Sequence, residues 1–351
     1  MMKLKAGIIG ATGMVGQRFI ELLRDHPFFE VSALMASERS AGKRYGEAAS
    51  WYLTSSIPED ISEMEVQLID TKAAEENGVD IIFSAIPSSI AREVEGSFAE
   101  DYPVFSNTAT YRMEEDIPLL VPEVNPEHFS LIDVQRRKRG WDGFIATNPN
   151  CSTIGLVIPL KPLYDELGVK SVNVATMQAL SGAGYSGVPS MAILDNVIPY
   201  ISGEEGKLES EPAKILGELD GEKINYAGFP IFASCNRVMV RDGHTESVFV
   251  ELENDFSVED VEEILSSFRG LPQDLGLPSA PENPIVVFES EDRPQPLFDR
   301  SLGGGMSVSV GRIRKQDERK LKFTCLSHNT IRGAAGASIL NAELALKKKI
   351  I

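Results

Sequence analysis

Residues 4–9 read Leu-Lys-Ala-Gly-Ile-Ile, and residues 10–16 read Gly-Ala-Thr-Gly-Met-Val-Gly. A helical pattern starts within these glycines, and a second strand-like run covers residues 31–36. Strand, glycine turn, helix and strand make a βαβ unit, in which the glycines let backbone approach a pyrophosphate at the helix N-terminus. The spacing, G-x-x-G-x-x-G, differs from the commoner G-x-G-x-x-G, so the motif gains its weight from the βαβ context.

The character of the chain changes near its middle. Up to residue 147 strands and helices alternate, with further strands expected at 79–85, 103–106 and 144–147, which predicts an α/β, Rossmann-type doubly wound sheet. The later strand-like runs have few helices between them, the clearest being 258–268, so we predict an α+β domain with a mixed sheet. Those runs are 172–179, 231–240, 247–253, 284–289, 306–312 and 321–327. We expect the final segment, 333–349, to pack back on the first domain.

Composition narrows the function. The 351 residues include 34 basic and 52 acidic ones, for a net charge of −18, which argues against nucleic-acid binding. No apolar run approaches the roughly 20 residues of a membrane span, so no membrane partner is expected. Cys151, Cys235 and Cys325 are widely spaced, which fits neither a disulfide framework nor a zinc site. We therefore expect no metal and a reducing, cytoplasmic setting.

The end of the second strand indicates the cofactor. An NAD site usually places an acidic side chain there to hold the ribose 2′-hydroxyl. Here Ser37, Arg39 and Ser40 can bind a 2′-phosphate, and arginine can do so with two hydrogen bonds. We therefore predict NADP, although Glu38 could face the ribose instead.

Cys151 follows Asn-Pro-Asn and precedes a helical run at 154–167. A cysteine at a helix N-terminus feels the positive end of the helix dipole, which favours the reactive thiolate. The alternative is a small buried residue without chemistry. Beside a nucleotide motif, this cysteine suggests an enzyme that holds an acyl group as a thioester and transfers a hydride.

A histidine is the expected partner in proton transfer. His244 sits in a glycine-containing turn between two strand-like runs, where an imidazole can reach a cleft, and His328 is its rival. His128 lies in a polar stretch, and His26 is expected at the surface.

Two further side chains could share that cleft. Arg237, seven residues before His244, can hold a carboxylate bidentately or form a surface salt bridge. Gln178 ends a strand, and a buried glutamine is costly unless it is paired, so a site role and a structural role are both open.

The motifs together resemble the aspartate-semialdehyde dehydrogenases of archaea and fungi, over nearly the whole chain. They occur in this order: the loop at 10–16, Asn-Pro-Asn-Cys at 148–151, Gln178 with Ser-Gly-Ala-Gly at 181–184, Arg237 with Asp-Gly-His-Thr-Glu at 242–246, and Asn329 with Arg-Gly-Ala-Ala-Gly at 332–336. Each motif is modest alone, but the combination is highly specific.

The resemblance implies a role for each matching residue. Cys151 matches the nucleophile that forms the thioacyl enzyme, Gln178 the residue that orients the intermediate, His244 the general acid/base, and Arg237 the clamp on the substrate α-carboxylate. Further substrate contacts are implied as follows: Glu204 with the substrate amino group, and Lys207, Arg112 and Asn150 with phosphate. Residues 201–211 are polar and could instead form an exposed loop.

The implied reaction is the NADPH-dependent reductive dephosphorylation of L-aspartyl 4-phosphate to L-aspartate 4-semialdehyde, in the biosynthesis of lysine, methionine and threonine. The expected cofactor contacts are Gly10, Thr12, Gly13, Met14, Val15, Ser37, Arg39, Ser40, Ser84, Ser181, Gly182 and Asn329. We assign residues 1–150 and 330–351 to the NADP-binding domain and 151–329 to a catalytic and dimerisation domain, and expect a homodimer or homotetramer.

Rival functions remain at this point. A malonyl-CoA reductase or an N-acetylglutamyl-phosphate reductase of the same fold is nearest, although Glu204 would have no amino group to meet in malonyl-CoA. A non-catalytic NADP sensor and a Cys/His hydrolase are more distant, and the hydrolase would not need the glycine motif.

Overall fold

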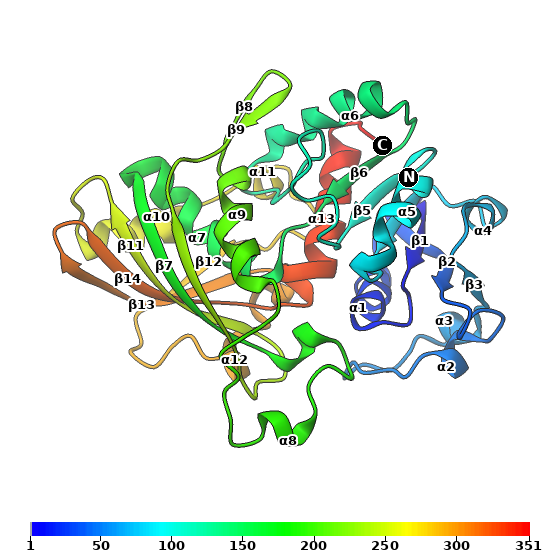
Figure 1. Ribbon diagram of the computed structural model, residues 1–351, viewed down its shortest axis with the longest axis horizontal. Helices are drawn as coiled ribbons and strands as arrows, with labels where there is room; N and C mark the ends of the chain where they lie inside the picture. Colours follow the sequence, from blue (N-terminus) through cyan, green and yellow to red (C-terminus); the bar gives the residue numbers. More distant parts are fainter. Residues whose placement is uncertain (1) are drawn as a thin grey trace. The chain divides into compact units, whose positions relative to one another are not determined.

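Two units make up the structure, a computed structural model that describes residues 2–351 (Figure 1). The first contains the chain up to Leu120 together with Glu127–Asn148 and Ala334–Ile351. The second contains Val121–Pro126 and Pro149–Gly333. The short excursion Val121–Pro126 belongs to the second unit although the sequence on both sides of it belongs to the first.

A six-stranded parallel sheet forms the centre of the first unit, in the order β3-β2-β1-β4-β5-β6. This is the strand order of a doubly wound nucleotide-binding sheet, so the predicted fold class is confirmed. The strands are β1 (Leu4–Ile9), β2 (Phe29–Ala36), β3 (Val66–Leu68), β4 (Ile81–Ser84), β5 (Pro103–Ser106) and β6 (Phe144–Thr147). Strand β3 has only three residues and was not predicted from the sequence.

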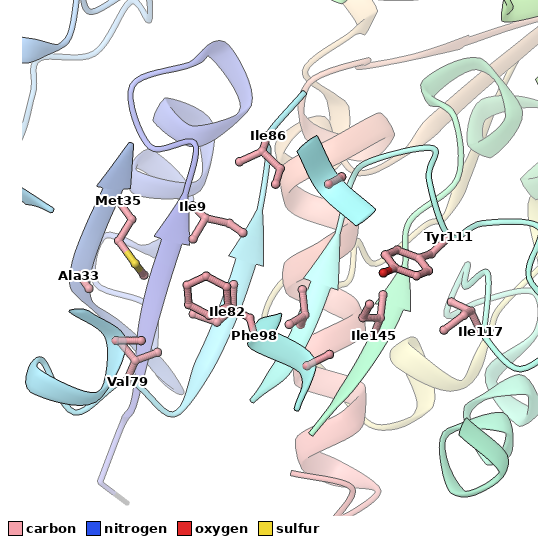
Figure 2. Close-up of a cluster of buried hydrophobic side chains, with 14 residues drawn as sticks. Ile9, Ala33, Met35, Val79, Ile82, Ile86, Phe98, Tyr111, Ile117 and Ile145 are labelled. Atoms are coloured by element: carbon pink, nitrogen blue, oxygen red, sulfur yellow. The ribbon is translucent and has the colours of Figure 1, made fainter. Parts of the chain in front are cut away.

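Apolar side chains from these strands pack with the helices around them. Figure 2 shows one such cluster, in which Ile9, Met35 and Ile82 from three neighbouring strands meet Phe98 of α5. The helices of this unit are α1 (Met14–Leu23), α2 (Tyr45–Ala48), α3 (Glu59–Glu63), α4 (Thr71–Glu76), α5 (Ser88–Ala99), α6 (Leu131–Arg139) and α13 (Gly336–Lys347). As predicted, the C-terminal helix α13, red in Figure 1, packs on the first unit, against α1 and β5.

The surface position expected for His26 is wrong. The side chain is buried, and its Nε2 lies 2.8 Å from Oε1 of Glu343, a fully buried residue of α13. The Nδ1 atom accepts hydrogen bonds from the backbone N of Phe28 and Phe29. A buried carboxylate needs a polar partner, and His26 supplies one.

The second unit contains a mixed six-stranded sheet in the order β10-β7-β11-β14-β13-β12. The two outer pairs, β10 with β7 and β12 with β13, are parallel, and the other pairs are antiparallel, which confirms the predicted mixed sheet. Its strands are β7 (Val169–Gln178), β10 (Ile231–Arg237), β11 (His244–Leu252), β12 (Ile285–Phe288), β13 (Val308–Asp317) and β14 (Lys320–Ser327). Strands β8 (Glu218–Asp220) and β9 (Lys223–Asn225) form a separate hairpin.

Helix α7 (Cys151–Leu167) packs against this sheet and against two further helices, α9 and α10. The helices of the second unit besides α7 are α8 (Ser190–Ile193), α9 (Glu204–Ile215), α10 (Val258–Ser267), α11 (Leu271–Asp274) and α12 (Pro296–Asp299). Across residues 2–351, no helix is long and apolar enough to span a membrane.

Candidate active site

The strand register of the second unit arranges the side chains that face α7 and α9 in rows. Residues two apart on a strand point to the same face of a sheet, so paired strands carry matching levels. The first row is Arg237, Gln178, His244 and Ser327, the second is Cys235, Thr176, Glu246 and Cys325, and the third is Ala233, Val174, Val248 and Phe323. The first row, at the strand ends, is therefore polar, whereas the third row is apolar.

His244 is the first residue of β11, whereas the sequence placed it in a turn before a strand at 247–253. The turn ends one residue earlier, at Gly243, whose φ of +100° favours glycine. The correction matters because a strand fixes the imidazole more firmly than a loop does. His244 pairs in register with Ser327 and is fully buried.

Helix α7 begins at Cys151, three residues before the predicted helical run. Asn150 is its N-cap, and the side-chain Oδ1 accepts hydrogen bonds from the backbone N of Ser152 at 3.0 Å and of Thr153 at 3.3 Å. A capping asparagine satisfies N–H groups that the helix itself leaves unpaired. The cap therefore holds Cys151 at the first helical position, where the helix dipole favours a thiolate.

Cys151 lies beside the histidine that the sequence predicted. Its Sγ is 3.1 Å from Nε2 of His244. Cys151 is partly exposed, while Cys235 and Cys325 are buried. Burial raises the pKa of Cys235 to about 11 and that of Cys325 well above the usual range, so these two thiols are poor nucleophiles.

The other ring nitrogen of His244 defines its tautomer. The backbone N of Ala179 donates a hydrogen bond to Nδ1 at 3.0 Å, so the neutral ring carries its proton on Nε2 and directs it toward sulfur. Burial, with Arg237 and His328 nearby, lowers the pKa of His244 to about 3. Near neutral pH the imidazole is therefore an uncharged hydrogen-bond donor.

Arg237 is held close to the same histidine. Its Nη1 donates to the carbonyl oxygen of Ala179 at 2.5 Å, so the backbone of one residue bonds to both Arg237 and His244. Burial lowers the pKa of Arg237, against the opposing effect of Cys151 and Glu204, but a guanidinium remains charged at neutral pH. A Cβ on Gly182 would lie 3.0 Å from Arg237 Nη1 and 3.3 Å from His244 Cε1. Gly182 therefore allows the chain to pass close to both.

Gln178 and Asn329 complete the surroundings of His244. Gln178 is buried, and its Nε2 donates weakly to Thr176 Oγ1 at 3.4 Å. Asn329 Nδ2 donates to Ser181 Oγ at 2.8 Å, while its Oδ1 accepts from the backbone N of Gly243 at 2.9 Å. Asn329 thus joins the two loops on either side of the imidazole.

Glu204 lies at the start of α9, so the alternative of an exposed loop at 201–211 is wrong. The side chain is largely buried, and its Oε1 accepts from Lys207 Nζ at 2.6 Å. The other oxygen, Oε2, accepts from Asn150 Nδ2 at 2.8 Å. Three residues predicted to bind substrate therefore form one connected group beside Cys151.

The other residues predicted to bind cofactor or phosphate lie in the first unit, at or beyond the carboxyl ends of its parallel strands. Gly10 has φ of +84°, and a Cβ there would lie 2.6 Å from the carbonyl oxygen of Ala85. Gly13 is the N-cap of α1, and among the described residues no side chain caps this helix and no acid lies in its first turn. The unscreened N-terminus fits a pyrophosphate, as NADP would place there.

The NADP 2′-phosphate is expected at the turn after β2. The backbone N of Ser40 donates to Ser37 O at 2.9 Å, and the turn leaves Ser37 and Arg39 exposed at the sheet edge. A charged donor and hydroxyls at this edge fit a phosphate.

Ser84 and Arg112 are more enclosed than the other predicted residues of this unit. Ser84 is fully buried and its hydroxyl donates to Glu95 Oε1 at 2.6 Å, so the side chain serves an internal network. Arg112 is also buried, with Nη2 donating to Asn107 O at 2.9 Å.

The backbone at Gly333 approaches Cys151 closely, which was not predicted from the sequence. Residues Ile331–Ala335 form a π-helical turn, a feature often found at functional sites. A Cβ on Gly333 would lie 2.6 Å from Cys151 Cβ. The neighbouring Arg332 is fully buried and forms a bidentate ion pair with Glu123, at 2.8 and 2.5 Å. The glycine of Arg-Gly-Ala-Ala-Gly was the available signal for the close approach, whereas the buried acidic partner of Arg332 lies 209 residues away in the sequence.

No group of three or more histidine, cysteine or acidic side chains that could hold a metal occurs in the described part of the chain.

Known proteins are similar to this chain over nearly its whole length. Residues 5–132 match the model of the semialdehyde dehydrogenase NAD-binding domain, and residues 160–332 that of the semialdehyde dehydrogenase dimerisation domain. An aspartate-semialdehyde dehydrogenase from Methanothermobacter thermautotrophicus is 58% identical over 97% of this chain and 98% of its own. The crystal structure of aspartate-semialdehyde dehydrogenase with NADP from Candida albicans superposes with a TM-score of 0.90, at 45% identity and full coverage of both chains.

A relative with another activity is more distant. The malonyl-CoA reductase (NADP) of Metallosphaera sedula is 42% identical over 99% of this chain and 98% of its own. The archaeal and fungal similarity agrees with the resemblance drawn from the motifs. The chain therefore belongs to the semialdehyde dehydrogenase family, in the branch of the archaeal and fungal aspartate-semialdehyde dehydrogenases.

Proposed function

We propose that this chain is an NADP-dependent aspartate-semialdehyde dehydrogenase that converts L-aspartyl 4-phosphate to L-aspartate 4-semialdehyde through a thioacyl enzyme. One observation carries the proposal: Cys151 starts α7 with its Sγ 3.1 Å from His244 Nε2, beside Arg237 and Glu204. The similarity to named aspartate-semialdehyde dehydrogenases supports the same activity. Such an enzyme serves the biosynthesis of lysine, methionine and threonine.

Cys151 performs the first step. Its thiolate attacks the acyl carbon of the phosphorylated substrate, a carbon–sulfur bond forms, and the carbon–oxygen bond to phosphate breaks. The Nε2–H of His244 and the dipole of α7 stabilise the thiolate before the attack. The N–H groups of Ser152 and Thr153 already donate to Asn150, so the start of α7 favours the tetrahedral oxyanion through the helix dipole.

His244 serves as the donor in the second step. NADPH, when bound, supplies the hydride that reduces the thioester carbon. The negative charge that then develops on the substrate oxygen can be stabilised by the Nε2–H of a neutral imidazole, a role known for histidines whose pKa is lowered. As the aldehyde forms, the carbon–sulfur bond breaks and the charge returns to sulfur, where the same N–H meets it. The ring therefore needs no second proton, which refines the predicted acid/base role.

Charged side chains recognise the substrate. We assign the α-carboxylate to Arg237, whose planar guanidinium can bind it bidentately, and the α-amino group to Glu204. Asn150, Lys207 and Arg112 are assigned to phosphate. Lys207 already contacts Glu204 at 2.6 Å, so substrate would enter an existing ion pair.

Arg39 is assigned to the 2′-phosphate of NADP. Replacing Arg39 with alanine should raise the KM for NADPH far more than the KM for NADH, because only NADPH carries that phosphate. Steady-state kinetics with both cofactors test this assignment. An equal change in both KM values would transfer the cofactor preference to other residues.

A homo-oligomer in the cytoplasm completes the proposal. The matched dimerisation domain covers the mixed sheet, on which Phe232 and Phe249 are 58% and 43% exposed. Exposed aromatic side chains on a sheet face favour association. Three free cysteines agree with a reducing compartment. Light scattering of the purified protein would distinguish a dimer from a tetramer, and a monomer would refute the assembly.

The activity is tested by NADPH formation from aspartate semialdehyde, NADP and phosphate. Matched reactions omit phosphate, or replace aspartate semialdehyde and phosphate with malonic semialdehyde and coenzyme A. Phosphate-dependent turnover of aspartate semialdehyde is expected. Turnover only with the coenzyme A pair would keep Cys151 as nucleophile but show a malonyl-CoA reductase, and would remove the amino-group role from Glu204.

A further inference from the structure

Glu211 has no role in the chemistry described above, yet it bonds to the residue that precedes the nucleophile. The side chain is only 2% exposed. Its Oε2 accepts a hydrogen bond from the backbone N of Asn150 at 2.7 Å. A buried carboxylate is costly unless hydrogen-bonded, and the Asn150 N–H supplies such a bond to Glu211.

Glu211 and Glu204 act on Asn150 from one face of α9. They are seven residues apart, which is close to two helical turns and places both on the same side. Glu204 accepts from the side-chain Nδ2 of Asn150 and Glu211 accepts from its backbone N. Asn150 Oδ1 meanwhile caps Ser152 and Thr153. The cap residue is therefore held by its side chain and its backbone at once.

The backbone contact replaces one that helices usually supply themselves. In a capping box, the side chain three residues after the N-cap bonds to the N-cap backbone N–H. That position in α7 is Thr153, whose Oγ1 has no hydrogen-bond partner within residues 2–351. Glu211 takes over this function from another helix, 61 residues away from Asn150.

We propose that Glu211 is a positioning residue that holds the start of α7, and with it Cys151, in the attacking geometry. The consequence for turnover rests on the proposed function. When Glu204 turns to the substrate amino group, Asn150 Nδ2 loses that partner and becomes available to phosphate. Glu211 accepts from the backbone N of Asn150 and not from its side-chain Nδ2, so this contact persists while the side-chain contact is exchanged. It keeps the nucleophile fixed during the exchange.

The charge of Glu211 has a separate effect that the experiment can isolate. A carboxylate near a helix N-terminus stabilises the helix, but it also opposes a thiolate at Cys151. Glutamine keeps an oxygen that accepts the Asn150 N–H and removes the charge. Alanine removes both. The proposed role depends on the hydrogen bond, so glutamine should preserve it.

Glu209 provides a matched control on the same helix. Its Oε1 accepts from the backbone N of Ala233, in strand β10, at 3.1 Å. A Glu209→Ala variant therefore also removes a carboxylate-to-backbone hydrogen bond of α9, but not the one at Asn150. Glu209 is exposed and Glu211 is buried, so the melting temperature of each variant is compared to separate damage to α9 from misplacement of Cys151.

The experiment compares Glu211→Ala, Glu211→Gln and Glu209→Ala in the full-length protein. For each we would measure kcat and KM for aspartate semialdehyde, and the rate at which iodoacetamide alkylates Cys151 without substrate or cofactor, followed by mass spectrometry. Glu211→Ala should lower kcat by roughly tenfold or more with KM within about twofold, because small misplacements of a reacting group are costly. It should also slow alkylation severalfold. Glu211→Gln should keep kcat within about threefold, and Glu209→Ala should behave like the wild type.

Three results would overturn the proposal. They are an unchanged kcat in Glu211→Ala, an equal fall in kcat in Glu211→Ala and Glu209→Ala, and a rise in KM without a fall in kcat. If Glu211→Ala does not fold, Glu211→Asp replaces it, since the shorter side chain withdraws the carboxylate from Asn150. Should the wild type fail to use aspartate semialdehyde, the proposed function would fall, while the alkylation rates would still test the positioning of Cys151.

Discussion

Two helices of this molecule start at sites of chemistry, and they start in opposite ways. Helix α7 has a side-chain cap, and its N-cap residue Asn150 is bonded in turn by Glu204 and Glu211. Helix α1 has Gly13 as its N-cap, and the described residues provide it with neither a side-chain cap nor an acid in the first turn. The N-terminus of α7 is therefore capped by protein side chains, and we call it the closed start. The N-terminus of α1 has no such cap among the described residues, and we call it the open start.

The difference shows how one physical device serves two purposes. Both starts offer unpaired N–H groups and the positive end of a dipole. At α7 the Asn150 side chain bonds to such N–H groups, and the helix dipole acts on Cys151. At α1 it leaves them to the phosphates of a cofactor. A mutation that caps α1 should therefore weaken cofactor binding, whereas a mutation at the start of α7 should lower turnover.

The largest effect is expected from Cys151→Ala. Without a nucleophile kcat should fall by roughly 10⁴-fold or more, because no thioacyl enzyme can form. NADPH affinity should remain within about twofold, since Gly13 and the open start are untouched. Steady-state assays and a fluorescence titration with NADPH measure the two quantities. Substantial residual turnover would refute the covalent route.

The variant Gly13→Asp should close the open start. Gly13 has φ of −78° and ψ of 170°, which any residue adopts, and a Cβ there would meet only ordinary contact, at 3.4 Å from Gly10 O. An aspartate can cap α1 and should stabilise it, but its charge competes with the pyrophosphate. NADPH affinity should fall roughly 10- to 30-fold while Tm stays or rises. A lower Tm with unchanged affinity would contradict the comparison.

A smaller effect is expected on the pH dependence of turnover, and it comes from His244, which lies beside Cys151 at the closed start. Because the pKa of His244 is lowered to about 3, the ring stays neutral between pH 5 and 7, and its protonation should not limit kcat/KM there. His244→Gln, which keeps an N–H donor, should lower kcat by roughly 10- to 100-fold and leave the acid side of the profile in place. Loss of an inflection near pH 6.5 in that variant would instead show that an imidazolium operates in the wild type.

The smallest effect is expected on the free energy of unfolding, and it comes from Glu246, in the second row of side chains below α7. Burial raises the pKa of Glu246 well above its usual range, so this carboxyl is neutral in the fold but ionises above about pH 4.5 in the unfolded chain. Its stabilising contribution is therefore present below pH 4.5 and is lost as pH rises. Glu246→Gln does not titrate, so its advantage in free energy of unfolding over the wild type should grow between pH 5 and pH 8. Urea denaturation at both pH values measures this, and an advantage that shrinks with pH would contradict a neutral Glu246.

Periodicity and glycine placement were enough to predict most of the fold. Strands β1, β5 and β6 have the bounds that the apolar runs predicted, because strands buried in a parallel sheet are short, continuous and apolar. Strand β3 was missed because its three residues give too little pattern. The excursion Val121–Pro126 could not be foreseen, since Glu123 within it pairs with Arg332, which lies 209 residues away in the sequence.

The site was predicted by residue type more readily than by environment. Cys151, His244 and Arg237 were predicted from motif and spacing, and the structure brings them together in the second unit. The burial of Glu204 was not, because a polar run such as 201–211 looks alike on an exposed loop and on a helix that faces a polar site. The spacing of seven between Glu204 and Glu211 was a usable signal, but only contact with Asn150 gives it meaning.

The central claim is that Cys151 carries the substrate as a thioester, and peptide mass spectrometry tests it most directly. The protein would be mixed with aspartate semialdehyde and NADP in the absence of phosphate, phosphate would then be added to a parallel sample, and both samples would be quenched and digested. A thioacyl enzyme requires an aspartyl adduct on the peptide that contains Cys151, formed only with NADP and discharged by phosphate. Turnover without any adduct, or an adduct confined to another residue, would contradict it.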